Sequence, residues 1–245
     1  MCFKTEIHLS RTEIENRFGR TFKKGEEFEP RYYFSAFDFP KMPVICQQES
    51  SVIQMMHWGL IPEWISNKDE AFDFRKNTLN AKFETLDEKK SFQQSVDSQR
   101  CLLINHGFFE YRHENSKKIP YYIRRKDNEA FAIACIFSNW QKEEMCYAGF
   151  SLITCEANSL LSSIHNSQKR MPLMLEPELG NIWLDEKWRF RQLKNEMKAI
   201  ESDKLEAWPI NEIPLRNINY LNSPQLLEPR KVKNIPQQLN LFDTI

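Results

Sequence analysis

A cysteine stands directly behind the initiator methionine in the opening Met-Cys-Phe-Lys-Thr-Glu-Ile. Because methionine is commonly removed when the second residue is small, the mature chain is expected to begin at Cys2, with an α-amine and a thiol on adjacent carbons. In ordinary surroundings the amine titrates near ~8 and the thiol near ~8.5, so a useful fraction of the amine is uncharged at neutral pH. Such a 1,2-aminothiol condenses with an aldehyde and closes to a thiazolidine ring. A cysteine at the second position also occurs by chance, so other residues must support this chemistry.

Three further polar residues stand where the surrounding pattern is apolar. Glu110 lies between Phe109 and Tyr111 at the end of an expected strand, where a low dielectric would raise its pKa and suit it to proton transfer. His165 follows a short expected helix and opens a loop, a placement that often carries functional residues. Asn80 interrupts an amphipathic run. Each also has an ordinary structural explanation: an outward-facing edge carboxylate, a structural histidine, and a turn or cap residue.

The composition predicts one globular domain and excludes several classes of protein. With 245 residues, of which 41% are hydrophobic, the chain can bury one sizeable core. Lys plus Arg (34) balances Asp plus Glu (34), so any polyanion site must be a local patch. Apolar runs stay well below the ~18 residues needed to cross a bilayer, which favours a cytoplasmic protein with no membrane contact. The six cysteines form no Cys-x-x-Cys pair, which favours reduced thiols over disulfides or a zinc site.

The pattern of elements indicates an α+β fold. Short segments rich in β-branched and aromatic residues, bounded by turn residues, predict strands and hairpins in residues 51–58, 100–111 and 120–140. Helical spacing occurs in residues 11–20, which end near a glycine cap at Gly19, and in residues 85–96, 156–164 and 185–200. Strands and helices mix without a regular βαβ alternation, which favours α+β over a parallel α/β sheet.

Five motifs, taken together, resemble the SRAP family, the SOS response-associated peptidase proteins. They are Met-Cys at the start, Trp58-Gly59-Leu60-Ile61-Pro62-x-Trp64, Asn80-Ala81-Lys82-x-Glu84-Thr85, Gly107-Phe108-Phe109-Glu110-Tyr111, and Ile164-His165 followed by Arg170-Met171-Pro172. They occur in the family's order and at about its spacing, from Cys2 to about Pro229. Five ordered matches are far more specific than any one of them.

Members of this family form a protective covalent bond with abasic sites in single-stranded DNA, and the resemblance implies that activity here. It implies a single domain over residues 2–229 with a β-barrel-like core flanked by helices, and no metal or organic cofactor. One pocket would gather Cys2 as the nucleophile, Glu110 as a proton shuttle, His165 as a second acid or base, and Asn80 as the amide that orients the N-terminus.

The resemblance also implies a set of DNA contacts. Lys82, Arg100 and Arg170 are expected to neutralise phosphates, each adding about 0.7 to the salt dependence of single-strand binding. Trp64 is expected to stack on an exposed base, a contact worth ~1 to 3 kcal/mol, whereas Trp58 is equally well explained as a core residue.

The chain departs from the family pattern in three places. The family's Asn-Ala-Arg ends here in Lys82, so a bidentate phosphate contact becomes a point-charge contact. A Tyr-Asn-Val-Ala-Pro stretch is replaced by Tyr33-Phe34-Ser35-Ala36-Phe37, which leaves open how the DNA strand is wedged. The loop between His165 and Arg170 is also longer than usual.

Two functions of other classes fit the same residues. Cys2 could be the nucleophile of an N-terminal cysteine hydrolase or peptidase, an activity that would include removal of Met1. Alternatively, the protein could be a non-catalytic single-stranded DNA-binding module, which would use the aromatic and basic residues and be indifferent to Cys2. A covalent product with abasic DNA is expected if the protein captures abasic sites, and is expected neither of a hydrolase nor of a non-catalytic binding module.

Residues 230–245 form a basic, proline-bounded tail outside the expected domain. Gln238, Leu239, Leu241 and Phe242 match the Gln-Leu-x-Leu-Phe peptide with which many bacterial repair proteins bind the sliding clamp. We therefore expect a monomer in a bacterial cytoplasm, associated with the nucleoid, that this peptide brings to replication forks. The same apolar residues could instead fold back onto the domain.

Overall fold

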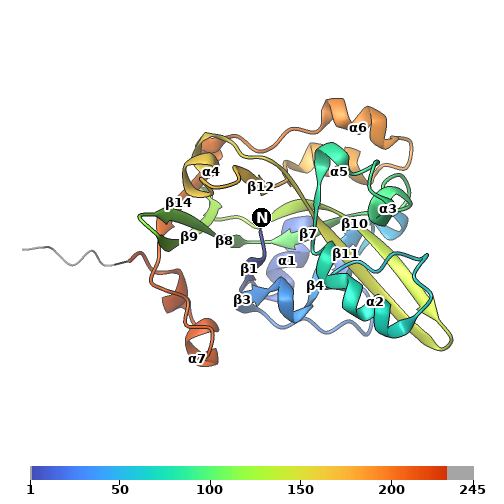
Figure 1. Ribbon diagram of the computed structural model, residues 1–245, viewed down its shortest axis with the longest axis horizontal. Helices are drawn as coiled ribbons and strands as arrows, with labels where there is room; N and C mark the ends of the chain where they lie inside the picture. The colour runs from blue at the N-terminus through green and yellow to red at the C-terminus, as the bar shows by residue number, and fades with distance from the viewer. Residues whose placement is uncertain (1, 231–245) are drawn as a thin grey trace, which may run out of the picture.

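The structure is a computed structural model, and it describes residues 2–230 of the chain (Figure 1). The strands are β1 (Lys4–Ile7), β2 (Thr21–Phe22), β3 (Arg31–Ser35), β4 (Lys41–Cys46), β5 (Val52–Trp58), β6 (Asn80–Lys82), β7 (Arg100–Asn105), β8 (Gly107–Glu114), β9 (Lys117–Arg125), β10 (Phe131–Lys142), β11 (Met145–Glu156), β12 (Arg170–Pro172), β13 (Met174–Leu175) and β14 (Leu205–Pro209). The α-helices are α1 (Arg11–Phe18), α2 (Lys68–Phe74), α3 (Lys90–Gln93), α4 (Ser159–Ile164), α5 (Pro177–Leu184), α6 (Phe190–Glu196) and α7 (Ile218–Leu221). The fold is α+β, as the sequence predicted.

Five strands close into a barrel at the centre of the molecule. The antiparallel pairs β5–β4, β4–β7, β7–β10 and β10–β11 form a continuous sheet, and a parallel contact between β11 and β5 closes it. Side chains opposite one another on these strands fill the interior; Cys46, Cys101 and Cys135 form one such row across β4, β7 and β10. Helix α5 covers one side, where Trp183 donates its indole N–H to the carbonyls of Cys101 and Cys135 at 3.1 and 3.2 Å.

Two glycines allow the barrel to close. A Cβ at Gly149 would lie 2.4 Å from the carbonyl oxygen of Gly59, a distance that carbon and oxygen atoms do not tolerate. Gly59 itself has a φ of 120° and donates its N–H to the carbonyl of Phe150 at 2.8 Å. The Trp-Gly pair of the motif at residues 58–64 therefore marks the place where the end of β5 meets β11.

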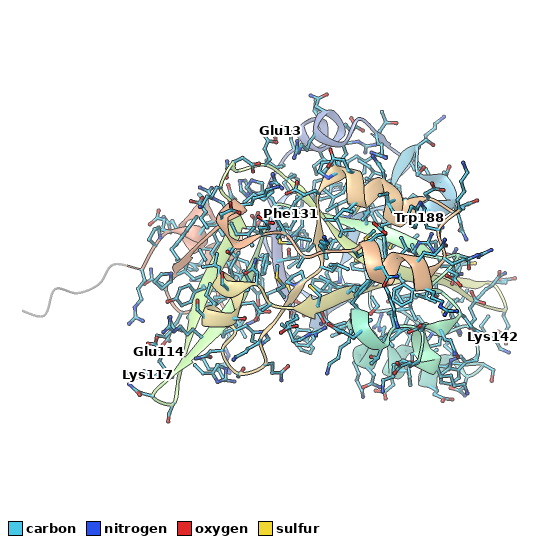
Figure 2. The ribbon with its side chains drawn as sticks, turned by 90° about the horizontal axis from the view of Figure 1, so that it is seen from above. Glu13, Glu114, Lys117, Phe131, Lys142 and Trp188 are labelled. Atoms are coloured by element: carbon cyan, nitrogen blue, oxygen red, sulfur yellow. The ribbon has the colours of Figure 1, made fainter. Side chains whose placement is uncertain are left out.

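A second sheet, in the order β14-β9-β8-β1-β3, extends from the barrel through the turn between β7 and β8. The N-terminal strand β1 lies between β8 and β3, so the chain begins inside this sheet and not at its edge (Figure 1). The β8–β9 and β10–β11 hairpins project from opposite ends of the molecule, where Figure 2 shows Glu114 and Lys117 at one end and Lys142 at the other. Among the described residues, no helix is long and apolar enough to cross a membrane.

The expected strands are confirmed, and so is the helix beginning at residue 11. Its first turn carries a capping box between Ser10 and Glu13, and it ends at Gly19 with a φ of 61°. Two other helices are shorter than predicted: residues 85–96 contain only α3, and residues 185–200 contain only α6.

A buried arginine occupies carbonyls at the start of the second of these segments. Arg100 is fully buried and donates to five backbone carbonyls: Val96 and Asp97 after α3, and Trp183, Asp185 and Trp188 around the end of α5, at 2.6 to 3.2 Å. The carbonyls of Asp185 and Trp188 lie within the helix predicted for residues 185–200, where they would accept from the backbone four residues later. Arg100 therefore cannot contact a phosphate in this structure, and the DNA contact predicted for it is wrong.

Replacing Arg100 should reduce stability and leave DNA affinity unchanged in the protein that remains folded. Arg100→Met removes all five donors and leaves buried carbonyls without partners, so we expect the free energy of unfolding to fall by roughly 3 to 5 kcal/mol. Urea denaturation measures this loss, with Arg100→Lys as an intermediate control that keeps the charge. Unchanged stability together with weaker single-strand binding would show that the side chain acts at the surface.

Candidate functional site

Cys2 lies against strand β8 because β1 pairs with it. The pairs Thr5↔Phe108 and Glu6↔Gly107 run antiparallel, so each step from Thr5 toward the N-terminus matches a step from Phe108 toward Glu110. Cys2 is buried, and its thiol lies 3.7 Å from the carbonyl oxygen of Lys4. Burial raises the pKa of the thiol well above its usual value, and the nearby Glu110 carboxylate raises it further. The thiol is therefore neutral at physiological pH.

Glu110 is the buried carboxyl group of this site, with 4% of its surface exposed. Burial raises the pKa of Glu110, and electrostatic interactions with His165 and Lys4 and a hydrogen bond from the Tyr111 backbone only partly oppose this shift. The protonated form thus persists to higher pH than for an exposed glutamate, as a proton donor requires. The outward-facing alternative for this residue is excluded, and its burial agrees with the sequence prediction.

His165 reaches the site from the end of α4. Its Nδ1 lies 2.9 Å from the carbonyl oxygen of Arg170 and 3.4 Å from the backbone nitrogen of the same residue. The shorter contact is to an acceptor, which favours the tautomer with a proton on Nδ1 and leaves Nε2 for proton exchange. Asn166 exchanges two hydrogen bonds with the backbone of His113, at 3.1 and 2.9 Å, and so attaches this loop to β8. The loop that is longer than the family pattern is therefore fixed to the strand that carries Glu110.

Asn80 begins β6, which pairs in parallel with β11. Leu152 of β11 pairs with Asn80 of β6 on one side and with Cys135 of β10 on the other. Cys2 is close enough to Cys135 to interact with it electrostatically. The backbone before Asn80 is held by Trp58, whose indole N–H donates to the carbonyl of Leu79 at 2.8 Å. Trp58 is fully buried and belongs to the core.

The amide of Asn80 lacks partners in the described part of the chain. Both its oxygen and its nitrogen are buried, and neither has a hydrogen-bond partner there. Leaving a buried polar atom unpaired costs about 1 to 3 kcal/mol, so such an atom in a native structure requires an explanation. A bound substrate or a rearranged N-terminus would supply the missing partners.

The residues expected to contact DNA lie in different environments. Lys82 is exposed on the same face of β6 as Asn80, because side chains two apart on a strand share a face. Trp64 is 38% exposed, and the ammonium of Lys90 lies 4.3 Å from its ring centre. Both positions suit the predicted contacts, which remain predictions.

Arg170 has a strong internal partner. It forms a bidentate pair with Glu84, with two N–O distances of 2.8 Å, and donates to the carbonyl of Thr154 at 2.6 Å. The pair connects two of the motifs, because it joins the 3-10 helix that follows β6, Phe83–Thr85, to β12 after the histidine loop. A phosphate would have to compete with Glu84 for this guanidinium, and phosphate contact by Arg170 remains a prediction.

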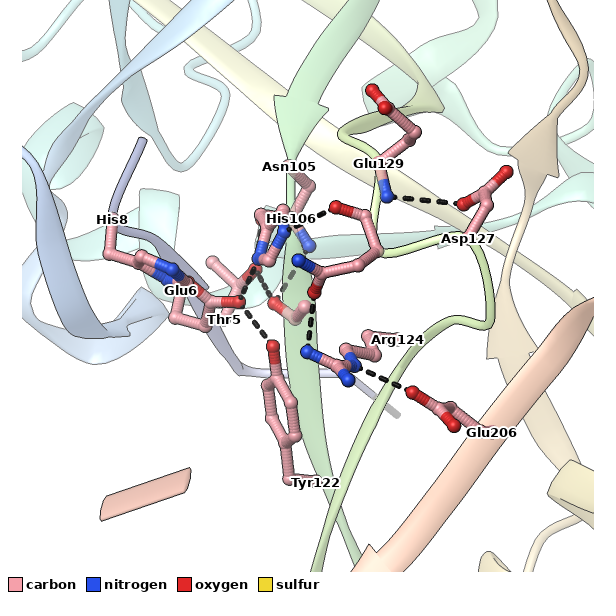
Figure 3. Close-up of polar contacts among 12 residues, drawn as sticks. Thr5, Glu6, His8, Asn105, His106, Tyr122, Arg124, Asp127, Glu129 and Glu206 are labelled. Carbon is pink, nitrogen blue, oxygen red and sulfur yellow. Dashed lines mark hydrogen bonds and ion pairs between the residues drawn. The ribbon is translucent and has the colours of Figure 1, made fainter. Parts of the chain in front are cut away.

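A second polar cluster, centred on Glu6, was not predicted from the sequence. The buried Glu6 carboxylate accepts hydrogen bonds from His106 Nδ1 at 2.9 Å, His8 Nδ1 at 2.7 Å and the Tyr122 hydroxyl at 2.6 Å (Figure 3). Glu6, His8 and His106 could in principle hold a metal ion, but these separations are those of hydrogen bonds with protons between the atoms. The only sequence signal was a glutamate two residues before a histidine in an apolar strand.

Comparison with known proteins identifies the family. The model of the family described as SOS response associated peptidase (SRAP) matches residues 1–213. The Bacillus subtilis abasic site processing protein YoqW is 32% identical over 194 residues, which cover 76% of this chain and 81% of YoqW. The Xenopus tropicalis abasic site processing protein HMCES is 29% identical over 156 residues, covering 55% of this chain and 45% of HMCES.

Solved structures agree with this assignment. A crystal structure of a Bacteroides thetaiotaomicron protein is 32% identical and superimposes with a TM-score of 0.87, covering 94% of this chain and 100% of that one. A Bordetella bronchiseptica protein with 18% identity and a TM-score of 0.73 shares the fold. The chain, with its closed barrel and with Cys2, Glu110 and His165 at one site, belongs to the SRAP family.

Proposed function

We propose that this protein binds abasic sites in single-stranded DNA and captures them as a covalent thiazolidine at Cys2. The observation that carries the proposal is that Cys2 and Glu110 are both buried and close enough to interact electrostatically, a neutral thiol near a carboxyl group of raised pKa. The names of the relatives, abasic site processing proteins, support the same substrate.

The reaction needs the two groups of Cys2 in sequence. Once Met1 is removed, the neutral α-amine adds to the aldehyde of the ring-opened deoxyribose, and loss of one water gives an imine. The thiol S–H then adds across the C=N bond: sulfur bonds to carbon, the proton goes to nitrogen, and a thiazolidine closes. This last step consumes a thiol and an imine without any redox partner.

The surrounding residues have distinct roles in this scheme. Protonated Glu110 gives a proton to the sugar ring oxygen during ring opening and to the departing hydroxyl during imine formation. His165 Nε2 is placed to exchange a proton with a sugar hydroxyl. The amide of Asn80, which has no hydrogen-bond partner among residues 2–230, is available to orient the free amine and the sugar.

The thiol's environment argues against the hydrolase alternative. An N-terminal cysteine hydrolase needs a thiolate nucleophile, whereas burial raises the pKa of the Cys2 thiol and so favours the neutral thiol here. Thiazolidine closure begins with attack by the amine, so it does not need a preformed thiolate. Removal of Met1, by the protein itself or by an aminopeptidase, generates the same aminothiol in either case.

The Cys2 side chain should determine how stable the adduct is. Cys2→Ser keeps the amine, so it should form an imine that borohydride traps but no adduct that survives boiling in detergent without reductant. The measurement is a denaturing gel of Met1-free protein mixed with single-stranded DNA carrying one abasic site. An N-terminal extension that cannot be removed should abolish both products. If Cys2→Ser gives a detergent-stable product as fast as the parent, the aminothiol mechanism is wrong.

Glu110→Gln should separate catalysis from folding. Loss of the proton donor should slow adduct formation by roughly 10² to 10⁴, while binding of undamaged single strand changes little. Because burial raises the pKa of Glu110, the parent loses stability as pH rises from the usual glutamate pKa through the raised value. The variant should therefore be more stable than the parent at pH 8 and equally stable at pH 4 in thermal unfolding.

Two matched variants complete the Glu110 experiment. His165→Ala should give a rate defect of similar size, and Asn80→Ala a smaller one that also raises stability by removing unpaired buried atoms. An equal loss of undamaged DNA binding in Glu110→Gln would assign Glu110 a role in binding and not in proton transfer.

We also propose that the tail recruits the protein to the sliding clamp; its residues 231–245 lie outside the described residues. The support is the sequence match at Gln238, Leu239, Leu241 and Phe242. A Leu241→Ala, Phe242→Ala double variant should lose binding to purified clamp from the same organism and keep the parent's rate of adduct formation. Equal clamp binding by parent and variant, or none by either, would rule out this recruitment.

A further inference from the structure

The position of Cys2 depends on the register of a very short strand pairing. Only two residue pairs, Thr5↔Phe108 and Glu6↔Gly107, join β1 to β8. A slip of one residue would move Cys2 by about 3.4 Å along β8 and turn alternate side chains to the opposite face. Reacting groups tolerate a displacement of only about 1 Å, so this register must be fixed by something stronger than two pairs.

The other neighbour of β1 pairs with it regularly on the N-terminal side of Glu6 only. Strand β3 pairs with β1 at Lys4↔Ser35 and Thr5↔Phe34, and next at Ile7↔Arg31, so two steps on β1 then match three steps on β3. The extra residue on β3 interrupts the ladder opposite Glu6. Glu6 therefore has a regular backbone pair on the β8 side and none on the β3 side.

Glu6 is held by three donors from three parts of the fold. His106 comes from the turn before β8, Tyr122 from β9, and His8 from the end of β1 itself (Figure 3). Gly107 makes room for the cluster, because a Cβ there would lie 2.6 Å from a Glu6 oxygen and 2.4 Å from the Tyr122 hydroxyl. The glycine of the Gly-Phe-Phe-Glu-Tyr motif thus connects the Glu6 cluster to the strand carrying Glu110.

The cluster contains a buried ion pair. His106 Nδ1 faces the Glu6 carboxylate and its Nε2 faces the carbonyl of Asn128 at 3.1 Å, and because neither acceptor can donate, both nitrogens carry protons. Burial alone would raise the pKa of Glu6, but the hydrogen bonds from His106 and His8 outweigh it and hold this pKa at about 2. The same pairing raises the pKa of His106 against the effect of burial. Buried ionic groups of this kind are best known for fixing register.

We propose that Glu6 is a positioning residue for the reaction at Cys2: its carboxylate, held by His106, His8 and Tyr122, fixes the register of β1 on β8 and so keeps Cys2 beside Glu110. The expected effect of Glu6 on the rate of adduct formation rests on the proposed function, whereas its expected effect on the register of β1 does not.

The test compares Glu6→Gln with Tyr122→Phe in the Met1-free protein. Glu6→Gln keeps the shape and removes the charge, and we expect the rate of adduct formation at saturating abasic DNA to fall about 10- to 100-fold with an unchanged half-saturating DNA concentration. Tyr122→Phe removes one neutral donor and keeps the ion pair, so it should lower this rate by about 2- to 10-fold and serves as a milder variant if Glu6→Gln folds poorly.

Hydrogen exchange measures the register directly. The amides of Thr5 and Ile7 should lose at least about tenfold of their protection in Glu6→Gln, while amides of β10 in the barrel keep theirs. Labelling with 2-cyanobenzothiazole, a small reagent for N-terminal cysteine, checks that the aminothiol is intact in every variant.

Each other outcome overturns the inference. A normal rate despite lost β1 protection would mean that register does not limit the reaction, and a slow rate with full protection would mean that Glu6 acts chemically. Stoichiometric zinc uptake by the parent that Glu6→Gln abolishes would make the cluster a metal site. If the parent itself forms no adduct, the proposed function fails, and the exchange comparison still decides whether Glu6 fixes the strand.

Discussion

The antiparallel contact between β1 and β8 is the constraint on which the site depends. It holds β1, which begins two residues after Cys2, against the strand that carries Glu110, and both Cys2 and Glu110 are buried. Burial then gives each group its chemical character, because desolvation favours the neutral thiol and the protonated carboxyl. N-terminal residues are usually poorly ordered unless they are held in a sheet, and β1 is held on both sides.

The barrel supplies rigidity for residues that come from distant parts of the chain. Closure at Gly59 and Gly149 joins the end of β5 to β11, and β11 in turn pairs with β6 and β12. Asn80 therefore lies on β6 and the histidine loop leads into β12, and both strands pair with the barrel strand β11. The site keeps features that do not favour folding, including a desolvated carboxyl group and an unpaired buried amide. Such groups are expected where function, and not stability, determines the residue.

Sequence patterns were sufficient for the strands, and the family resemblance selected Cys2, Asn80, Glu110 and His165 as candidate site residues, but neither predicted the buried charges. Alternating apolar segments and the capping residues of α1 act locally, so residues 11–20 and 51–58 could be assigned from the sequence. Arg100 looked like a surface cation, because nothing local shows that the carbonyls of Trp183, Asp185 and Trp188, more than eighty positions later, accept hydrogen bonds from it. The ion pair of Glu6 with His106 joins residues one hundred positions apart, and its members are individually unremarkable in sequence. Buried polar groups such as these find their hydrogen-bond partners in distant parts of the chain, so the partners could be identified only from the three-dimensional structure.

The most direct measurement is the intact mass of the Met1-free protein after reaction with an oligonucleotide that carries one abasic site, followed by fragmentation of the N-terminal peptide. Condensation through both groups of Cys2 predicts a mass equal to protein plus oligonucleotide minus one water, with the modification on Cys2 and no dependence on reductant. A modification on any lysine, or an adduct that appears only after borohydride treatment, would contradict the assignment of the reaction to the N-terminal aminothiol.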